Sequence, residues 1–273
     1  MSTATVMEKN THLSARSESA RAEHAPIPFR TVFGVELRKA FDTRSGFWLM
    51  VAIAATGVIA TGAVLAFASD SDLTYDSFAA AIGVPMTILL PVVAILAVTS
   101  EWSQRAGLTT FTLVPHRGRV IRAKLAVTIA IGVASMALAL AIGAIGNIVG
   151  TGLMGVDTTW DLSFTSILYI VGADLLGMLV GFTLGVLTRN SAGAIVTYFS
   201  YWFVIPTLSA LLAANQEWFE KAQPWVDFNY DQGRLYDGSF TATEWTQLAV
   251  TGSFWLLLPL AFGLWRVVRA EVK

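Results

Sequence analysis

Cysteine is absent from the 273 residues of the chain, and charged residues are scarce. Without cysteine, the chain forms neither disulfide bonds nor thiolate metal centres. Charged residues make up 14% of the sequence and hydrophobic residues 55%, whereas a soluble domain carries about 25% charged residues. The mean hydropathy is +0.61. These values exclude an ordinary soluble domain and indicate an integral membrane protein.

The motifs of several enzyme classes are missing as well. The three histidines, His12, His24 and His116, lie outside the apolar runs, so no run carries the imidazole that a membrane protease dyad or a metal cluster needs. No lysine follows glycine in the GxxxxGK[ST] pattern of a phosphate-binding loop. We therefore expect no catalytic residue, no metal site and no cofactor on this chain, although a membrane enzyme that uses a lone Asp or Ser is left open. If ATP and Mg²⁺ drive the protein, they bind to a partner subunit.

Apolar runs recur along the chain at about 20 residues each, the length that an α-helix needs to cross the hydrocarbon of a bilayer. We expect an all-α integral membrane protein with six transmembrane helices. The predicted spans are residues 47–68, 78–99, 125–150, 163–187, 192–214 and 247–265. Together they form a single six-helix transmembrane domain over residues 47–273.

The region before the first span divides into two parts. Residues 1–28 are polar without an apolar period and predict a disordered cytoplasmic tail rather than a signal peptide. In residues 29–46, Phe29, Val32 and Phe33 share one helical face, which predicts an amphipathic helix lying in the membrane interface. A solvated helical lead-in to the first span is the alternative.

The positive charges indicate the orientation of the spans. If the N-terminus is cytoplasmic, 16 of the 18 Lys and Arg residues fall on the cytoplasmic side, and the other two are Lys221 and Arg234. Cytoplasmic loops carry the excess of Lys and Arg in membrane proteins. We therefore expect a multi-pass protein of the cell (plasma) membrane with both termini in the cytoplasm.

The segment 100–124, SEWSQRAGLTTFTLVPHRGRVIRAK, is the long basic connection between the second and third spans. Ser100 is placed to cap a helix to about Leu113, and Glu101 and Arg105 lie four residues apart on one helical face. Pro115 then ends the helix. Four cations follow without an intervening acid: Arg117, Arg119, Arg122 and Lys124. This pattern predicts a rigid cytoplasmic coupling loop on which another protein acts.

Less specific explanations exist for the same basic segment. Orientation of the spans and contact with anionic membrane lipid both favour cations at this position. Binding of nucleic acid is not expected, since the segment lies directly between two spans.

Small residues and prolines mark two features inside the predicted spans. Glycine recurs every four residues at Gly177, Gly181 and Gly185, and again at Gly146 and Gly150. Such spacing lets two helix backbones pack closely. Proline removes a backbone hydrogen bond and predicts a kink or an interruption at three positions, Pro85, Pro91 and Pro206.

Asp174 is the one ionisable residue within a predicted span. A carboxylate is costly in hydrocarbon, so Asp174 is a candidate contact on the transport path or a proton carrier. The alternative is that the fourth span begins later and leaves Asp174 at the outer interface. Asn147 is expected to form an interhelical hydrogen bond.

The outer segment, residues 215–246, is rich in aromatic rings and acids. Part of it is expected to be buried at the outer interface, with a short helix that ends before Pro224. An aromatic belt that anchors the last two spans and a segment that contacts the substrate are both consistent with this composition.

Three segments together resemble the permease subunits of ABC-2 type transporters, in the form common in actinobacteria. They are the interfacial segment VELRKAFDTRSGFWLM, the basic segment 100–124, and the end of the fourth span, GFTLGVLTRNSAGAIV. The resemblance implies an ATP-driven transporter, expected to be an exporter, in which a homodimer or heterodimer of permeases assembles with separate ABC-type ATPase subunits. It also implies that the ATPase is coupled through one group of residues: Glu101, Trp102, Arg105, Leu108, Arg117 and Arg119.

Two other functions fit the sequence. A stand-alone six-span secondary transporter or channel predicts ionisable groups near the membrane midplane or a repeat between the two halves of the sequence; Asp174 is the one such group, and no repeat is found. A membrane-anchored assembly or immunity protein without cargo would need no further feature. The transported substrate is not indicated, because similar scaffolds handle drugs, peptides, lipids and polysaccharides.

Overall fold

The computed structural model describes residues 28–103 and 117–269, and these residues form helices with one isolated bridge between Thr74 and Thr159. The fold is that of an all-α, multi-pass membrane protein, as the apolar runs predict. Six helical segments are long and apolar enough to cross a membrane: Gly46–Phe67, Tyr75–Ser100, Gly118–Met154, Phe164–Thr188, Ser191–Asn215 and Ala242–Val267. The predicted tail, apart from Pro28, lies outside the described residues.

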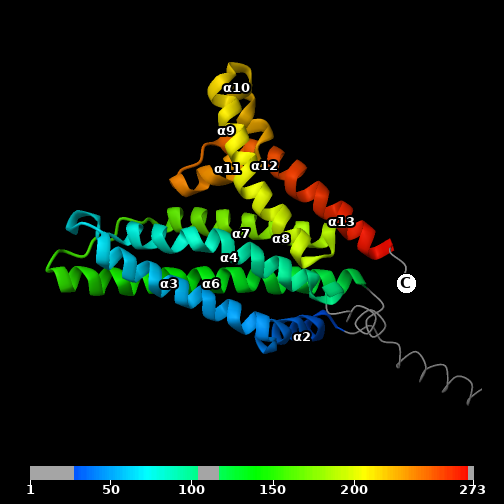
Figure 1. The fold of residues 1–273 in the computed structure, drawn as a ribbon, viewed down its shortest axis with the longest axis horizontal. Coiled ribbons are helices and arrows are strands. Elements are labelled where there is room, and N and C mark those ends of the chain that lie inside the picture. Colours follow the sequence, from blue (N-terminus) through cyan, green and yellow to red (C-terminus); the bar gives the residue numbers. More distant parts are fainter. Residues whose placement is uncertain (1–27, 104–116, 270–273) are drawn as a thin grey trace, which may run out of the picture.

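Four long helices make the main bundle, with α4 in contact with the other three (Figure 1). They are α3 (Arg44–Phe67), α4 (Tyr75–Ser103), α6 (Arg117–Met154) and α7 (Phe164–Thr188). The core between them is apolar, and Met86, Leu90 and Phe182 within it are fully buried. Pro85 and Pro91 lie inside α4, which nevertheless runs as one helix.

The glycine repeats lie at the contacts between these helices, as predicted. A Cβ atom at Gly181 of α7 would lie 2.7 Å from the carbonyl oxygen of Pro91 in α4. At Gly150 of α6 it would lie 2.4 Å from Leu65 Cδ2 in α3. At Gly181 the neighbour is backbone, so a larger residue would force α4 and α7 apart, whereas at Gly150 the neighbour is the end of a leucine side chain.

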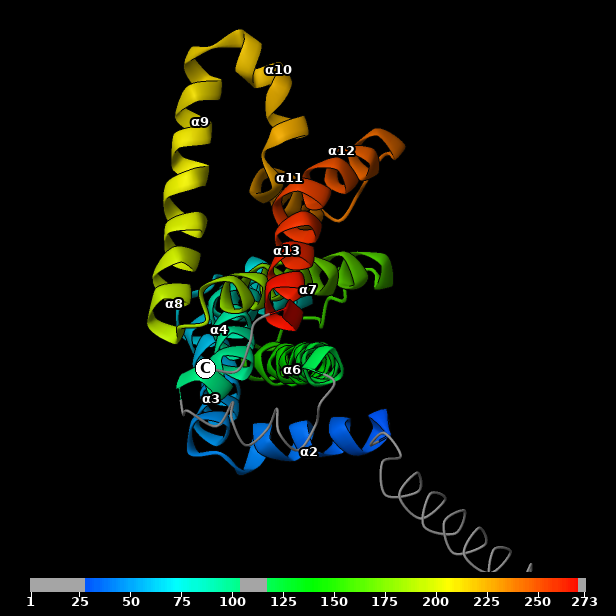
Figure 2. The ribbon, with the colours of Figure 1, turned by 90° about the vertical axis from the view of Figure 1, so that its right-hand side faces the viewer.

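The amphipathic helix α2 (Phe29–Asp42) lies across the ends of α3 and α6, nearly at right angles to the bundle (Figure 2). It is shorter than the predicted 29–46 because Thr43 caps α3, its Oγ1 accepting a hydrogen bond from the Gly46 amide at 3.2 Å. The turn is tight: a Cβ at Gly46 would lie 1.8 Å from the Ala40 carbonyl oxygen. We call the end where α2, the C-terminus of α4 and the N-terminus of α6 meet the basic end.

The opposite end of the bundle, here called the acidic end, carries η1 (Asp70–Asp72) and the connection 155–163. The Asp161 carboxylate accepts a hydrogen bond from the Asp76 amide at 2.9 Å, which joins the connection 155–163 to the first turn of α4. Asn147 donates to the Thr159 carbonyl oxygen at 2.9 Å. Asn147 therefore binds a loop backbone, and the expected hydrogen bond between spans is wrong.

The last two spans leave the main bundle and are each interrupted by a π-helical turn. Span five consists of α8 (Ser191–Phe199), η2 (Ser200–Val204) and α9 (Ile205–Asn215). Pro206 lies in the first turn of α9, where its missing amide explains the predicted interruption. Span six consists of α12 (Ala242–Gly252), η4 (Ser253–Leu257) and α13 (Leu258–Arg269).

Between these spans, the outer segment forms α10 (Glu217–Val226), α11 (Phe228–Arg234) and η3 (Leu235–Asp237). α9 and α10 project away from the main bundle, whereas α11 and η3 return to pack on α7 (Figures 1 and 2). The predicted end before Pro224 is wrong, because Pro224 lies inside α10. It is the eighth residue of that helix, and the helix continues for two more residues.

Candidate functional site

The basic end differs from the predicted coupling loop in where its helices end. α4 continues through Ser100 to Ser103, and the Ser100 hydroxyl donates to the Ala97 carbonyl oxygen at 2.9 Å. Ser100 is therefore inside a helix and is not an N-cap. The apolar period of the second span carries the helix past it, so the Ser100 amide already has a partner in the preceding turn.

The third span also begins earlier than predicted. α6 starts at Arg117, so the predicted basic cluster forms the first two turns of this helix: Arg117, Arg119, Arg122 and Lys124. The connection between α4 and α6 is thus residues 104–116 rather than 100–124, and these residues lie outside the described part of the chain. Lys124 is buried at 4% exposure, which a loop residue in water would not be.

The predicted coupling residues fall into two groups. Trp102 and Arg119 are described and half-buried, and the Arg189 guanidinium lies 5.9 Å from the centre of the Trp102 ring. This contact joins the end of α4 to the connection between α7 and α8. Glu101 and Arg117 lie within helices, but their side chains are outside the description, as are Arg105 and Leu108 altogether.

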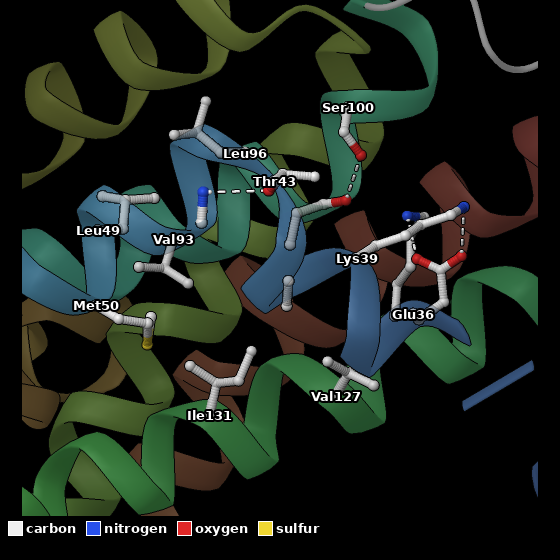
Figure 3. Close-up of a pocket in the computed structure, with 14 residues that line it drawn as sticks. Glu36, Lys39, Thr43, Leu49, Met50, Val93, Leu96, Ser100, Val127 and Ile131 are labelled. Carbon is white, nitrogen blue, oxygen red and sulfur yellow. Dashed lines mark hydrogen bonds and ion pairs between the residues drawn. The ribbon is translucent and has the colours of Figure 1, made fainter. Parts of the chain in front are cut away.

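A buried ion-pair cluster at this end was missed by the sequence analysis. Glu36 of α2 is 6% exposed and binds Lys124 Nζ of α6 at 2.5 Å through Oε2. Its other oxygen binds Lys39 Nζ at 2.9 Å (Figure 3). A signal was present, since Glu36 lies four residues after Val32 and thus on the apolar face rather than the polar one.

Asp174 lies inside the fourth span and is 2% exposed. α7 begins at Phe164, so Asp174 is about 15 Å along the helix from its start. The helix thus begins within one residue of the predicted start, and the later start on which the alternative position at the outer interface depended is not found. Asp174 Oδ1 accepts a hydrogen bond from the Tyr236 hydroxyl at 3.2 Å, and Oδ2 is buried without a hydrogen-bond partner among the described residues.

The outer segment contacts Asp174 and also binds the neighbouring backbone of α7. Gln232 donates to the Ala173 carbonyl oxygen at 2.9 Å. Burial and the nearby Asp174 carboxylate both raise the pKa of the Tyr236 hydroxyl, so it stays protonated and donates. The outer segment is therefore partly buried against α7, whereas its predicted burial at the outer membrane interface stays a prediction.

Other polar contacts fix the outer segment to span six. The Asp231 carboxylate is fully buried and accepts from the Thr251 hydroxyl at 2.7 Å. Arg234 forms an ion pair with Glu244 and donates to Gln247 at 3.2 Å. Within residues 28–103 and 117–269, no three acidic or imidazole side chains gather closely enough to hold a metal ion.

Comparison with protein-family models and with curated proteins identified no relative of the chain. The functional assignment therefore depends on the residues and on their arrangement.

Proposed function

We propose that the chain is the membrane-spanning permease subunit of an ABC-2 type transporter, coupled at its basic end to separate ABC-type ATPase subunits. The observation that carries the proposal is the pair of unbroken helices on both sides of residues 104–116. α6 has 38 residues and is about 57 Å long, well beyond the roughly 30 Å of hydrocarbon. Its first turns carry Arg119 and Arg122 and cannot lie in hydrocarbon, so they project at the basic end.

A displacement of the connection 104–116 by the ATPase would be transmitted to the bundle through two helices, α4 and α6. α4 carries it to α7 through the close contact of Pro91 with Gly181. α6 carries it to α2 through the buried pair of Lys124 with Glu36. Packed helices have discrete arrangements rather than a continuum, so closure of the ATPases switches access across the bundle.

The coupling residues have distinct roles in this mechanism. Glu101 and Arg105 orient the connection, and Leu108 with Trp102 offers apolar contact to the ATPase. Arg117 and Arg119 hold the start of α6 at the membrane surface or bind the ATPase directly. ATP and Mg²⁺ bind to the partner subunit.

The proposal also includes the orientation of the chain in the membrane and its pairing with a second permease subunit. The basic end faces the cytoplasm of the cell, with both termini on that side, because Lys and Arg accumulate there. In the most apolar 18-residue stretch of spans one and five, only 11% of the residues are buried within the chain. Their apolar faces are available to a second permease, identical or related, and to lipid.

A stand-alone secondary transporter or channel is the second candidate, and Asp174 favours it. A buried carboxylate with one unpartnered oxygen inside a span is the type of group that carries protons or binds substrate. The two candidates differ in their dependence on an ATPase. Substitution Asp174→Asn would abolish transport by a proton-driven carrier but leave an ATPase complex intact.

The test is purification of the tagged protein from its native membranes, with mass spectrometry of the proteins that accompany it. We expect an ATPase with a phosphate-binding loop, which is lost when residues 104–113 are replaced by a Gly/Ser linker. The matched control is the same type of linker in the acidic-end connection 155–162, which should retain the ATPase. Recovery of the intact bundle without an ATPase would overturn the proposal.

A further inference from the structure

A cavity of about 200 Å³ lies at the basic end among α2, α3, α4 and α6 (Figure 3). Its polar lining comes from the ends of these helices and includes Glu36, Lys39 and Lys124. The remaining wall is mostly apolar. Asp174 is not among the described residues that line this cavity.

The lining changes from polar to apolar with depth along the three bundle helices that contribute to it, α3, α4 and α6. On α4, Ser100 near the end is followed inward by Leu96 and Val93. Thr43 and Gly46 are followed by Leu49 and Met50 on α3, and Lys124 is followed by Val127 and Ile131 on α6. Because all three helices agree, the cavity has the polarity profile of one bilayer leaflet, from headgroup to chain.

The charge and the size of the cavity restrict its occupant. The charged groups in its described wall are one carboxylate and two ammonium groups, and the Lys39 side chain is 42% exposed. An engineered apolar cavity of about 150 Å³ holds one benzene, so this one accepts a stretch of acyl chain rather than a whole lipid. Basic pockets between spans bind anionic headgroups.

We propose that this cavity binds an anionic phospholipid, with the headgroup phosphate at the exposed Lys39 ammonium and the first part of one acyl chain between Leu96 and Ile131. The site goes beyond the proposed transport function and does not depend on it. A lipid in this position fills the space between α2 and the bundle, so the packing of α2 depends on the lipid composition of the leaflet at the basic end.

The experiment measures lipid retention by native mass spectrometry of the full chain in detergent, with phosphatidylglycerol and phosphatidylcholine of the same acyl chains as probes. We expect the chain to retain phosphatidylglycerol about fivefold better, the contribution of one surface lysine. Lys39→Gln should bring this ratio close to one. Arg38→Gln, the neighbouring cation outside the cavity, should leave the ratio unchanged.

Filling the cavity tests the acyl-chain part of the proposal. Ala97→Leu from α4 and, independently, Ala40→Leu from α2 should abolish retention of both lipids, whereas Ala130→Leu on the exposed side of α6 should not. Retention that is equal in Lys39→Gln and Arg38→Gln, or that survives both filled variants, would overturn the proposal. The proposal would also be overturned if inorganic phosphate displaced the lipid from the wild type and still bound to the filled variants. That result would identify a site for free phosphate.

Discussion

Glu36 and Lys124 lie 88 positions apart in the sequence and form an ion pair of 2.5 Å between α2 and α6. Both side chains are at most 5% exposed, so the pair is shielded from water. It ties the helix that crosses the basic end to the third span. The motion of one helix is therefore passed to the other.

Removal of one partner of this pair should destabilise the protein strongly. Glu36→Gln leaves the buried Lys124 ammonium without this carboxylate, and such changes cost about 3–5 kcal/mol. Thermal unfolding in detergent measures the loss. Glu36→Met combined with Lys124→Met should recover most of the stability, since apolar side chains replace both charges.

The control for this prediction is Lys39, which binds the same carboxylate from the surface. Its side chain is 42% exposed, and exposed pairs contribute about 1 kcal/mol or less. Lys39→Gln should thus change stability little. Equal losses from Glu36→Gln and Lys39→Gln would contradict the assignment of a buried pair.

Gly181 offers a test of the contact between α4 and α7. A Cβ here would lie 2.7 Å from backbone atoms of α4, so Gly181→Ala forces the helices apart at a cost of about 1–3 kcal/mol. Gly172 of the same helix has no atom within 4 Å of its Cβ position. Gly172→Ala should be neutral or stabilising. Comparable loss of thermal stability in both variants would contradict the close contact.

The spans and the glycine contacts were predictable because length and spacing are local properties of the sequence. The ends of the helices were less predictable from the sequence. Ser100 is a residue type that caps helices, but α4 continues past it to Ser103. The pairing of Glu36 with Lys124 joins distant parts of the chain, and its only local trace is the position of Glu36 on an apolar face. The hydrogen bond of Asp174 with Tyr236 depends on the fold of the outer segment, which composition alone does not determine.

Tyr236 should hold the outer segment against α7. Tyr236→Phe removes the one hydrogen bond described for the Asp174 carboxylate, and an unpaired buried group costs about 1–3 kcal/mol. We expect faster proteolysis within residues 217–237. Tyr230→Phe is the matched control because Tyr230 is exposed to a similar extent, 38% against 36% for Tyr236, and keeps its ring beside Arg234 without a hydroxyl hydrogen bond to the described residues. Equal cleavage of the two variants would exclude a role for the Asp174 contact.

Asp231 should make the packing of α11 on α12 depend on pH. Burial raises the pKa of this carboxyl from 3.8 to about 6; the Thr251 hydrogen bond and Arg234 lower it in part, while Asp227 raises it further. Because the folded state holds the proton more tightly, the stabilisation is complete below the ordinary pKa and is lost as the pH rises through about 6.

The measurement is the thermal stability of the wild type relative to Asp231→Asn at pH 5 and at pH 7.5. The wild type should lose stability relative to the variant at the higher pH. The Asn side chain does not titrate and retains an acceptor for Thr251. A difference that is constant across this range would contradict the account.

The absence of cysteine allows the coupling claim to be tested most directly by site-specific cross-linking. Leu108→Cys supplies a single thiol in the connection 104–116, and Asp157→Cys supplies one at the acidic end as the control. After treatment of native membranes with a short bifunctional cross-linking reagent, Leu108→Cys should form an adduct with an ATPase. The yield of this adduct should change when ATP and vanadate are added. Two results would contradict coupling through the basic end. One is an ATPase adduct from Asp157→Cys instead of Leu108→Cys. The other is the absence of an adduct from Leu108→Cys in membranes that contain the co-purifying ATPase.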